Sequence, residues 1–116
     1  LLAGADVAVS YFPRDPILDT NSPTKLLEYL ALGLPAVGTD NPDQAWVLQK
    51  SSAGVLTASS PIALAAGICA VLDDPATARR NASAGPAFIA TERSYDVIAR
   101  RVAAAYRHIC RMEDLQ

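Results

Sequence analysis

Three short apolar runs without polar alternation mark the chain as a parallel α/β protein. The runs cover residues 7–9, 35–39 and 53–57. Each is too short for a helix, and a strand with one face in water would alternate apolar and polar residues. We therefore predict three strands that are buried on both faces, as in a parallel sheet.

Segments with helical spacing lie between and after these runs, and most of them begin alike. A residue with a capping oxygen precedes a proline at Ser22, Asn41, Ser60 and Asp74. Such an oxygen accepts hydrogen bonds from the first helical amides, and the fixed φ of proline suits the first helical position. The predicted helices cover 23–33, 42–50, 61–73 and 75–90, and a last one, capped by Ser94, runs to about residue 112. Gly33 is the predicted stop of the first helix.

The order of the elements is strand, helix, strand, helix, strand, and then a series of helices. This alternation requires crossover connections and predicts an α/β fold with a doubly wound, Rossmann-like parallel sheet. Three strands are few for such a sheet, and the chain opens at Leu1 without the pattern of a signal peptide. We expect residues 1–116 to form a single domain that is a fragment of a larger one.

Composition narrows the range of functions. Apolar residues make up 51% of the chain and charged residues 19%, which suits a packed core. The formal net charge of −2 at pH 7 supplies no positive field, which argues against a general nucleic-acid binder. The apolar stretches fall short of the roughly 20 residues that a bilayer requires, so no transmembrane segment is predicted. Cys69 and Cys110 lie far apart within helical patterns and are interpreted as buried, reduced thiols of a cytoplasmic protein.

The last predicted helix has an apolar stripe. Its members are Val97, Ile98, Val102, Ala105, Tyr106 and Ile109. Our interpretation is a surface helix that covers the core, and docking against a neighbouring domain is the alternative. Trp46 and the sole histidine, His108, are assigned to packing or surface roles, and the scattered acids predict no metal site.

Candidate chemistry lies where the first strand passes into the first helix. Ligands of open α/β sheets bind beyond the carboxyl ends of the strands, and the connection 11–21 is unusually long. The amides of Thr24 and Lys25 begin a helix, where unpaired N–H groups attract anions, and Lys25 adds a positive charge. Glu28, one turn later, could accept hydrogen bonds from vicinal hydroxyls. A nucleoside diphosphate would fit this pattern; an exposed Lys25–Glu28 pair without function is the alternative.

The run SPTKLLEYLALGLPAV at residues 22–37 resembles the donor-binding segment of retaining group 1 (family 4) glycosyltransferases, which have the two-domain GT-B fold. Residues 5–10 resemble the strand that enters this segment. The resemblance implies that Thr24 and Lys25 are phosphate ligands and that Glu28 binds the ribose of a nucleotide-sugar donor. It also implies that the chain is the C-terminal part of a donor-binding domain.

Two departures from the family pattern matter. A second Glu normally stands eight residues before the ribose-binding one, but here that position is Thr20, and Asp19 and Asn21 are the candidate substitutes. The upstream Arg and Lys that neutralise the leaving diphosphate, and the N-terminal domain that binds acceptor, are absent from these 116 residues. The sugar contact and the catalytic residues therefore stay unassigned, and the fragment alone is expected to be inactive.

The expected function is transfer of a sugar, with retention, from a nucleotide-sugar donor to a saccharide or lipid-linked acceptor. We expect a cytoplasmic enzyme that needs no metal or cofactor and whose contact with a membrane would come only through the missing portion. A non-catalytic or receiver-like α/β module and a sugar-nucleotide epimerase of the same architecture are the alternatives. A nicotinamide-binding domain is disfavoured because no Gly-x-Gly-x-x-Gly follows a strand.

Overall fold

The computed structural model describes residues 2–113, and over these residues a three-stranded parallel sheet organises the chain. Its strands are β1 (Ala8–Ser10), β2 (Ala36–Thr39) and β3 (Gly54–Thr57), in the order β1-β2-β3. Val9 pairs with Val37, and Val37 pairs with Val55. The predicted parallel sheet is confirmed, with each strand within a residue or two of its expected position.

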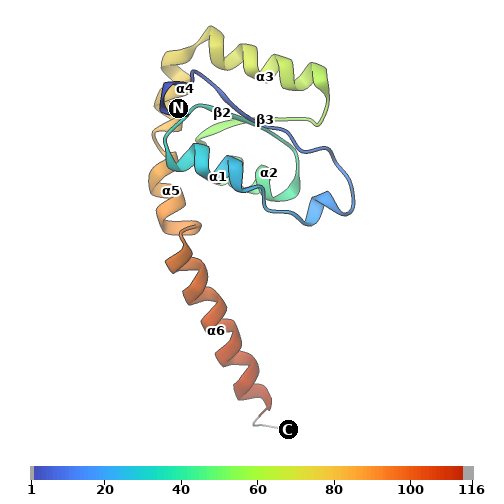
Figure 1. Cartoon of the computed structure of the whole chain (residues 1–116), viewed down its shortest axis with the longest axis vertical. Coiled ribbons are helices and arrows are strands. Elements are labelled where there is room, and N and C mark those ends of the chain that lie inside the picture. Colours follow the sequence, from blue (N-terminus) through green and yellow to red (C-terminus); the bar gives the residue numbers. More distant parts are fainter. Residues whose placement is uncertain (1, 114–116) are drawn as a thin grey trace.

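Helices cover both faces of this sheet (Figure 1). Helices α1 (Thr24–Ala31) and α2 (Pro42–Ser51) lie on one face, and α3 (Pro61–Asp73) lies on the other. Because successive strand residues point to opposite faces, Gly38 meets Leu48 of α2 while its neighbour Val37 meets Gly67 of α3. The doubly wound arrangement is therefore confirmed.

The main core lies between the sheet and the face that carries α1 and α2. Its fully buried members are Leu26, Leu30, Ala36, Val47, Leu48 and Ala53. Every residue of the central strand β2 is buried, as predicted for a strand covered on both faces. Strand β3 is only partly buried along its length, and β1 is partly buried at Val9. The prediction of full burial is wrong for these two because each has a neighbouring strand on one side only within the described residues.

The predicted helix 75–90 is in fact two helices, α4 (Pro75–Ala82) and α5 (Gly85–Glu92). Pro86 lacks the N–H that a continuous helix would need, and its ring clashes with the preceding turn. The break directs α5 across α1, where the backbone of Gly85 lies against the Leu30 carbonyl. Phe88 of α5 then packs on the core beside α1 and α2.

Gly33 terminates helix α1, as predicted, and lies two residues after its last helical residue, Ala31. This glycine has a φ of +67°, a conformation that other residues adopt with strain. The Gly33 amide donates to the Leu30 carbonyl and the Leu34 amide donates to the Tyr29 carbonyl, both at 3.0 Å. These two bonds form a Schellman motif, which satisfies the last carbonyls of the helix.

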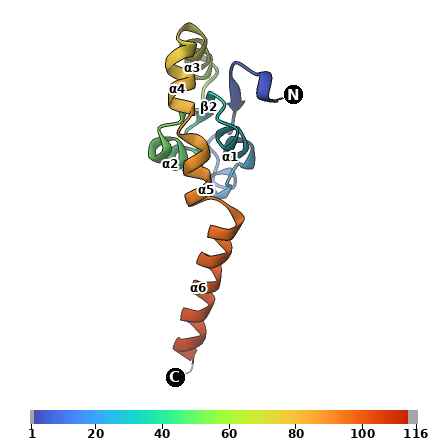
Figure 2. The same ribbon diagram turned by 90° about the vertical axis from the view of Figure 1, so that its left-hand side faces the viewer.

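Helix α6 (Tyr95–Glu113) leaves the body of the molecule and projects from it in both views (Figures 1 and 2). Its stripe residues Ile98, Val102, Tyr106 and Ile109 are 39–66% exposed, so the prediction that this helix covers the core is wrong. His108 is exposed on this helix. Among residues 2–113 no single helix is long and apolar enough to cross a membrane. One bent pair within this range, Pro61–Asp73 with Pro75–Arg111, has the length and composition of a membrane-crossing segment.

The two cysteines are exposed, which corrects the prediction that they are buried. On α3 the residues that face the sheet are Gly67 and Val71, and Cys69 lies on the opposite side of the helix. Cys110 belongs to the projecting α6. Because α3 has apolar residues on both sides, its sequence does not show which side is buried.

We expect Gly85→Ala to lower the free energy of unfolding by about 1–3 kcal/mol, the usual cost of overpacking. A Cβ at Gly85 would collide with the backbone of Leu30, which a side-chain rotation cannot relieve. Chemical denaturation measures the effect. Gly4→Ala is the control, because a Cβ there meets no atom within 4 Å. Equal stability of the two variants would contradict the close α1–α5 contact.

Candidate anion-binding site at the start of helix α1

The connection 11–21 between β1 and α1 is tied at its start to the end of β2. The Phe12 amide donates to the hydroxyl of Thr39 at 2.8 Å, and that hydroxyl donates to the Phe12 carbonyl at 2.7 Å. Thr39 is fully buried. The first part of the connection is therefore held over the carboxyl end of the sheet, where ligands of such folds bind.

The buried side chain of Asn41 ties down the later part of the connection. Its amide nitrogen donates to the Leu18 carbonyl at 2.8 Å. Its carbonyl oxygen accepts from the amides of Asp43 at 3.2 Å and Gln44 at 3.5 Å, which confirms Asn41 as the cap of α2. One side chain thus both begins α2 and positions the chain that leads to α1.

Several polar side chains of the connection form hydrogen bonds within it. Arg14 donates to both carboxylate oxygens of Asp19 at 2.9–3.1 Å, and these hydrogen bonds lower the pKa of Asp19 and raise that of Arg14. The Thr20 hydroxyl donates to the Ile17 carbonyl at 2.7 Å. Of the three positions considered for a sugar contact, Asn21 is the one that lines a cavity at the start of α1.

Helix α1 begins without a side-chain cap. Its N-cap is Pro23, and no side chain accepts from the amides of the first turn. The predicted capping role of Ser22 is wrong, because Pro23 occupies the N-cap position; the Ser22 hydroxyl donates to the Asp43 carboxylate at 2.7 Å. At the other predicted sites, Asn41, Ser60 and Asp74 do cap their helices. The first amides of α1 are thus left to a ligand or to water.

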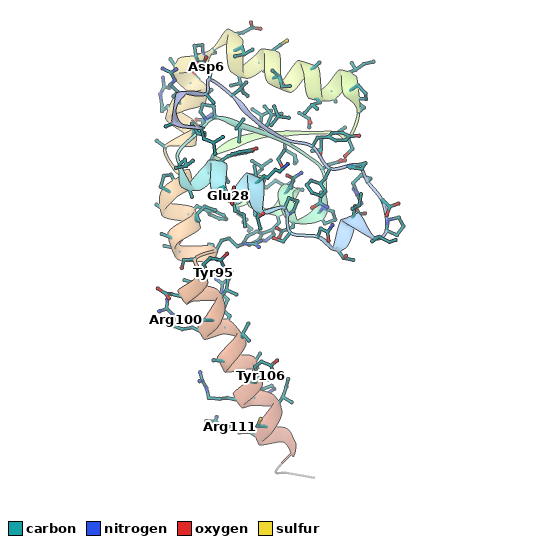
Figure 3. All side chains as sticks on the ribbon, in the orientation of Figure 1. Asp6, Glu28, Tyr95, Arg100, Tyr106 and Arg111 are labelled. Carbon is teal, nitrogen blue, oxygen red and sulfur yellow. The ribbon has the colours of Figure 1, made fainter. Side chains whose placement is uncertain are left out.

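Two cavities meet at this helix start. One, of about 230 Å³, is lined by Phe12, Asn21, Ser22, Pro23, Thr24 and Lys25. The other, of about 310 Å³, lies between α1, α5 and the start of α6, and is lined by Ser22, Thr24, Leu27, Glu28, Ala31, Ile89, Arg93, Tyr95 and Ile98. Figure 3 shows Glu28 on α1 and Tyr95 at the start of α6 below it. Ser22 and Thr24 belong to both walls, so they stand between the two spaces.

The three predicted ligand residues Thr24, Lys25 and Glu28 are exposed on the first two turns of α1. Lys25 faces the smaller cavity and Glu28 the larger, and Thr24 joins them. Among residues 2–113 no salt bridge joins Lys25 to Glu28, so the alternative of a simple ion pair finds no support in the geometry.

The arrangement suits an anion followed by a hydroxylated group. Uncapped amides and the positive end of the helix dipole favour negative charge, and the Lys25 ammonium adds to this attraction. The Glu28 carboxylate, further along the helix, is an acceptor for hydroxyl groups. No group of three or more His, Cys, Asp or Glu residues able to hold a metal ion occurs within residues 2–113.

Asp43 and Arg93 are in contact, which the sequence did not predict. Arg93 donates to Asp43 at 2.6 Å, and both side chains are less than a quarter exposed. Arg93 also lies 4.8 Å from the ring centroid of Trp46, whose expected packing role is confirmed by its contact with Phe88. The sequence signal was slight, because Asp43 reads as an ordinary first-turn acid and Arg93 lies fifty residues away.

Comparisons with known proteins bear on the family and on the fold. A family model described as "Glycosyl transferases group 1" matches residues 1–74. The fold resembles that of sucrose-phosphate synthase from Thermosynechococcus elongatus, with a TM-score of 0.72 at 23% sequence identity. The match covers 96% of the present chain and 27% of the other, so the chain spans about a quarter of that protein's length. No curated protein sequence matches the chain.

We expect Asn41→Asp to cost about 1–3 kcal/mol of folding stability, the range for a buried hydrogen-bonding group left without a partner. The new carboxylate can still cap α2, but it cannot donate to the Leu18 carbonyl. Hydrogen exchange should therefore rise within 11–21 while α2 stays protected. Ser60→Ala is the matched control, since it removes a helix cap away from this connection. Unchanged exchange in 11–21 would show that Asn41 does not hold it.

Proposed function

Because the chain belongs to the group 1 glycosyltransferase family, we propose that it forms part of the nucleotide-sugar donor site of a glycosyltransferase. The reaction we propose is transfer of the sugar, with retention of configuration, to a saccharide or lipid-linked acceptor. In this role Thr24 and Lys25 hold the diphosphate and Glu28 binds the ribose hydroxyls. The enzyme would act in the cytoplasm, and its contact with a membrane, where present, would come from other parts of the protein.

The observation that carries the proposal is the uncapped start of α1. As a glycosyl bond breaks, negative charge builds on the departing nucleoside diphosphate. Amides that are already oriented, together with a nearby ammonium group, stabilise that charge without reorganisation. The first turn of α1 offers both, from Thr24 and Lys25, at the edge of a cavity.

The acceptor site is proposed to lie in another part of the protein. The chain corresponds to 27% of the matched sucrose-phosphate synthase, which leaves room for a second domain in a complete enzyme. The stripe of Ile98, Val102, Tyr106 and Ile109 on α6 is exposed and would suit packing against such a domain. On this view the chain by itself binds donor fragments but does not catalyse transfer.

Product analysis separates the proposed reaction from its alternatives. The natural full-length protein, given a nucleotide sugar and a saccharide acceptor, should release nucleoside diphosphate and form a glycoside. An epimerase of the same architecture would instead return a changed sugar, and a non-catalytic module would return the nucleotide sugar intact.

We expect Glu28→Ala to weaken binding of a nucleoside diphosphate by about tenfold or more, as for loss of a charged hydrogen-bond partner. Binding of inorganic pyrophosphate should barely change, because pyrophosphate has no ribose. Lys25→Ala should weaken both ligands, since it removes a charge from the shared diphosphate site. Calorimetric titration of the full-length wild type and of both variants measures the six affinities. Equal losses for both ligands in Glu28→Ala would rule out its ribose role.

Asn21 is proposed to contact the donor sugar in place of the family's missing Glu. We expect Asn21→Ala to raise the KM for the nucleotide sugar about fivefold or more, with little change in the affinity for free nucleoside diphosphate. Thr20→Ala is the control, because the Thr20 hydroxyl is already engaged by the Ile17 carbonyl. A larger effect of Thr20→Ala than of Asn21→Ala would assign the contact to Thr20.

A further inference from the structure

The start of α1 has an acidic neighbour that an anion-binding site must overcome. Asp43, in the first turn of α2, accepts a hydrogen bond from the Ser22 hydroxyl, with 2.7 Å between the two oxygens. Ser22 is two residues before Thr24 and lines both cavities. The carboxylate is therefore one hydrogen bond away from a residue that lies two positions before the proposed diphosphate ligand Thr24. Left uncompensated, its charge would oppose diphosphate binding.

Arg93 supplies the compensating charge. Its guanidinium donates to the second Asp43 oxygen at 2.6 Å, so Ser22 and Arg93 engage the two oxygens of one carboxylate. The pair is sheltered, with side-chain exposures of 18% for Arg93 and 23% for Asp43. Among the ion pairs of residues 2–113 it is the one in which both side chains are less than a quarter exposed. Solvent screens such a pair less than an exposed one.

The fold keeps Arg93 at this place from a distant part of the chain. Arg93 directly follows α5, which is fixed across α1 by the Gly85 contact. Its guanidinium also lies over the Trp46 ring of α2, one turn after Asp43, so the cation is held on two sides. Arg93 lines the larger cavity together with Ser22 and Thr24.

We propose that Arg93 is a positioning residue for the donor site: by neutralising Asp43, it lets this carboxylate hold Ser22 beside the start of α1 without repelling the diphosphate. This inference rests on the proposed function, because it assumes that the ligand at Thr24 and Lys25 is an anion. It assigns a role in donor binding to residues of α2 and of the α5–α6 junction, outside the segment 22–37.

The test is a charge-rescue series in the natural full-length protein, with inorganic pyrophosphate as the probe. We expect Arg93→Gln to weaken pyrophosphate binding about five- to tenfold, the scale of one charge acting across partly solvated protein. The double variant Asp43→Asn, Arg93→Gln should bind within about twofold of the wild type, because the repelling charge is gone. The loss in Arg93→Gln should also shrink as salt is raised, since salt screens the charge.

Arg101→Gln is the matched control. Arg101 pairs with Glu92 at 2.7 Å across the same α5–α6 junction, but it does not reach Asp43. It should leave pyrophosphate affinity unchanged. Should Arg93→Gln prove poorly folded, Arg93→Lys, which keeps the charge, is expected to bind within about threefold of the wild type, and a full loss there would overturn the charge argument.

Normal binding by Arg93→Gln, or a double variant no better than Arg93→Gln, would overturn the inference. The proposed function is tested by a separate result, the binding of pyrophosphate and of a nucleoside diphosphate by the wild type and by Lys25→Ala. If the wild type binds pyrophosphate and Lys25→Ala does not, the diphosphate site survives even when the Arg93 series shows no effect. If the wild type binds neither pyrophosphate nor a nucleoside diphosphate, the proposed function itself fails.

Discussion

The hydrogen bond from the Asn41 side chain to the Leu18 carbonyl is the contact on which the candidate site depends. It joins a helix that the sheet fixes to a connection that has little regular structure of its own. Because Asn41 is fully buried, breaking this bond would leave polar groups without partners in the interior. The path of the chain into α1, and with it the direction of the first amides, follows from that constraint.

Local patterns were enough to predict most of the fold. The strands are short and apolar, and their residues carry little ambiguity once Gly33 and the proline-led helix starts are recognised. The errors arose where local signals competed with contacts distant in sequence. Ser22 has the chemistry of a cap, but the helix begins one residue further on, after Pro23, and the Ser22 hydroxyl contacts Asp43, twenty-one residues later. The helix 75–90 was predicted as continuous although Pro86 is a local signal for a break, and nothing local shows that Gly85 must approach Leu30.

The candidate site, too, contains residues that the sequence could predict and residues that it could not. Thr24, Lys25 and Glu28 could be named from the sequence because they share one helix and their spacing alone sets their relation. Asp43 and Arg93 could not, since their meeting depends on how α5 crosses α1. The exposure of α6 was also beyond local reasoning, because an amphipathic stripe indicates that a helix packs but does not name the surface that it packs on.

The projecting helix has a mechanical consequence. With 19 residues, α6 is about 28 Å long at 1.5 Å of rise per residue. It starts two residues after Arg93, so the Arg93–Asp43 ion pair lies at the base of the projecting helix. A rotation of α6 by about 10° about this base would move its C-terminal turn by roughly 5 Å. A partner that binds the distal turns of α6 and rotates the helix would therefore also shift Arg93 relative to the Asp43 carboxylate.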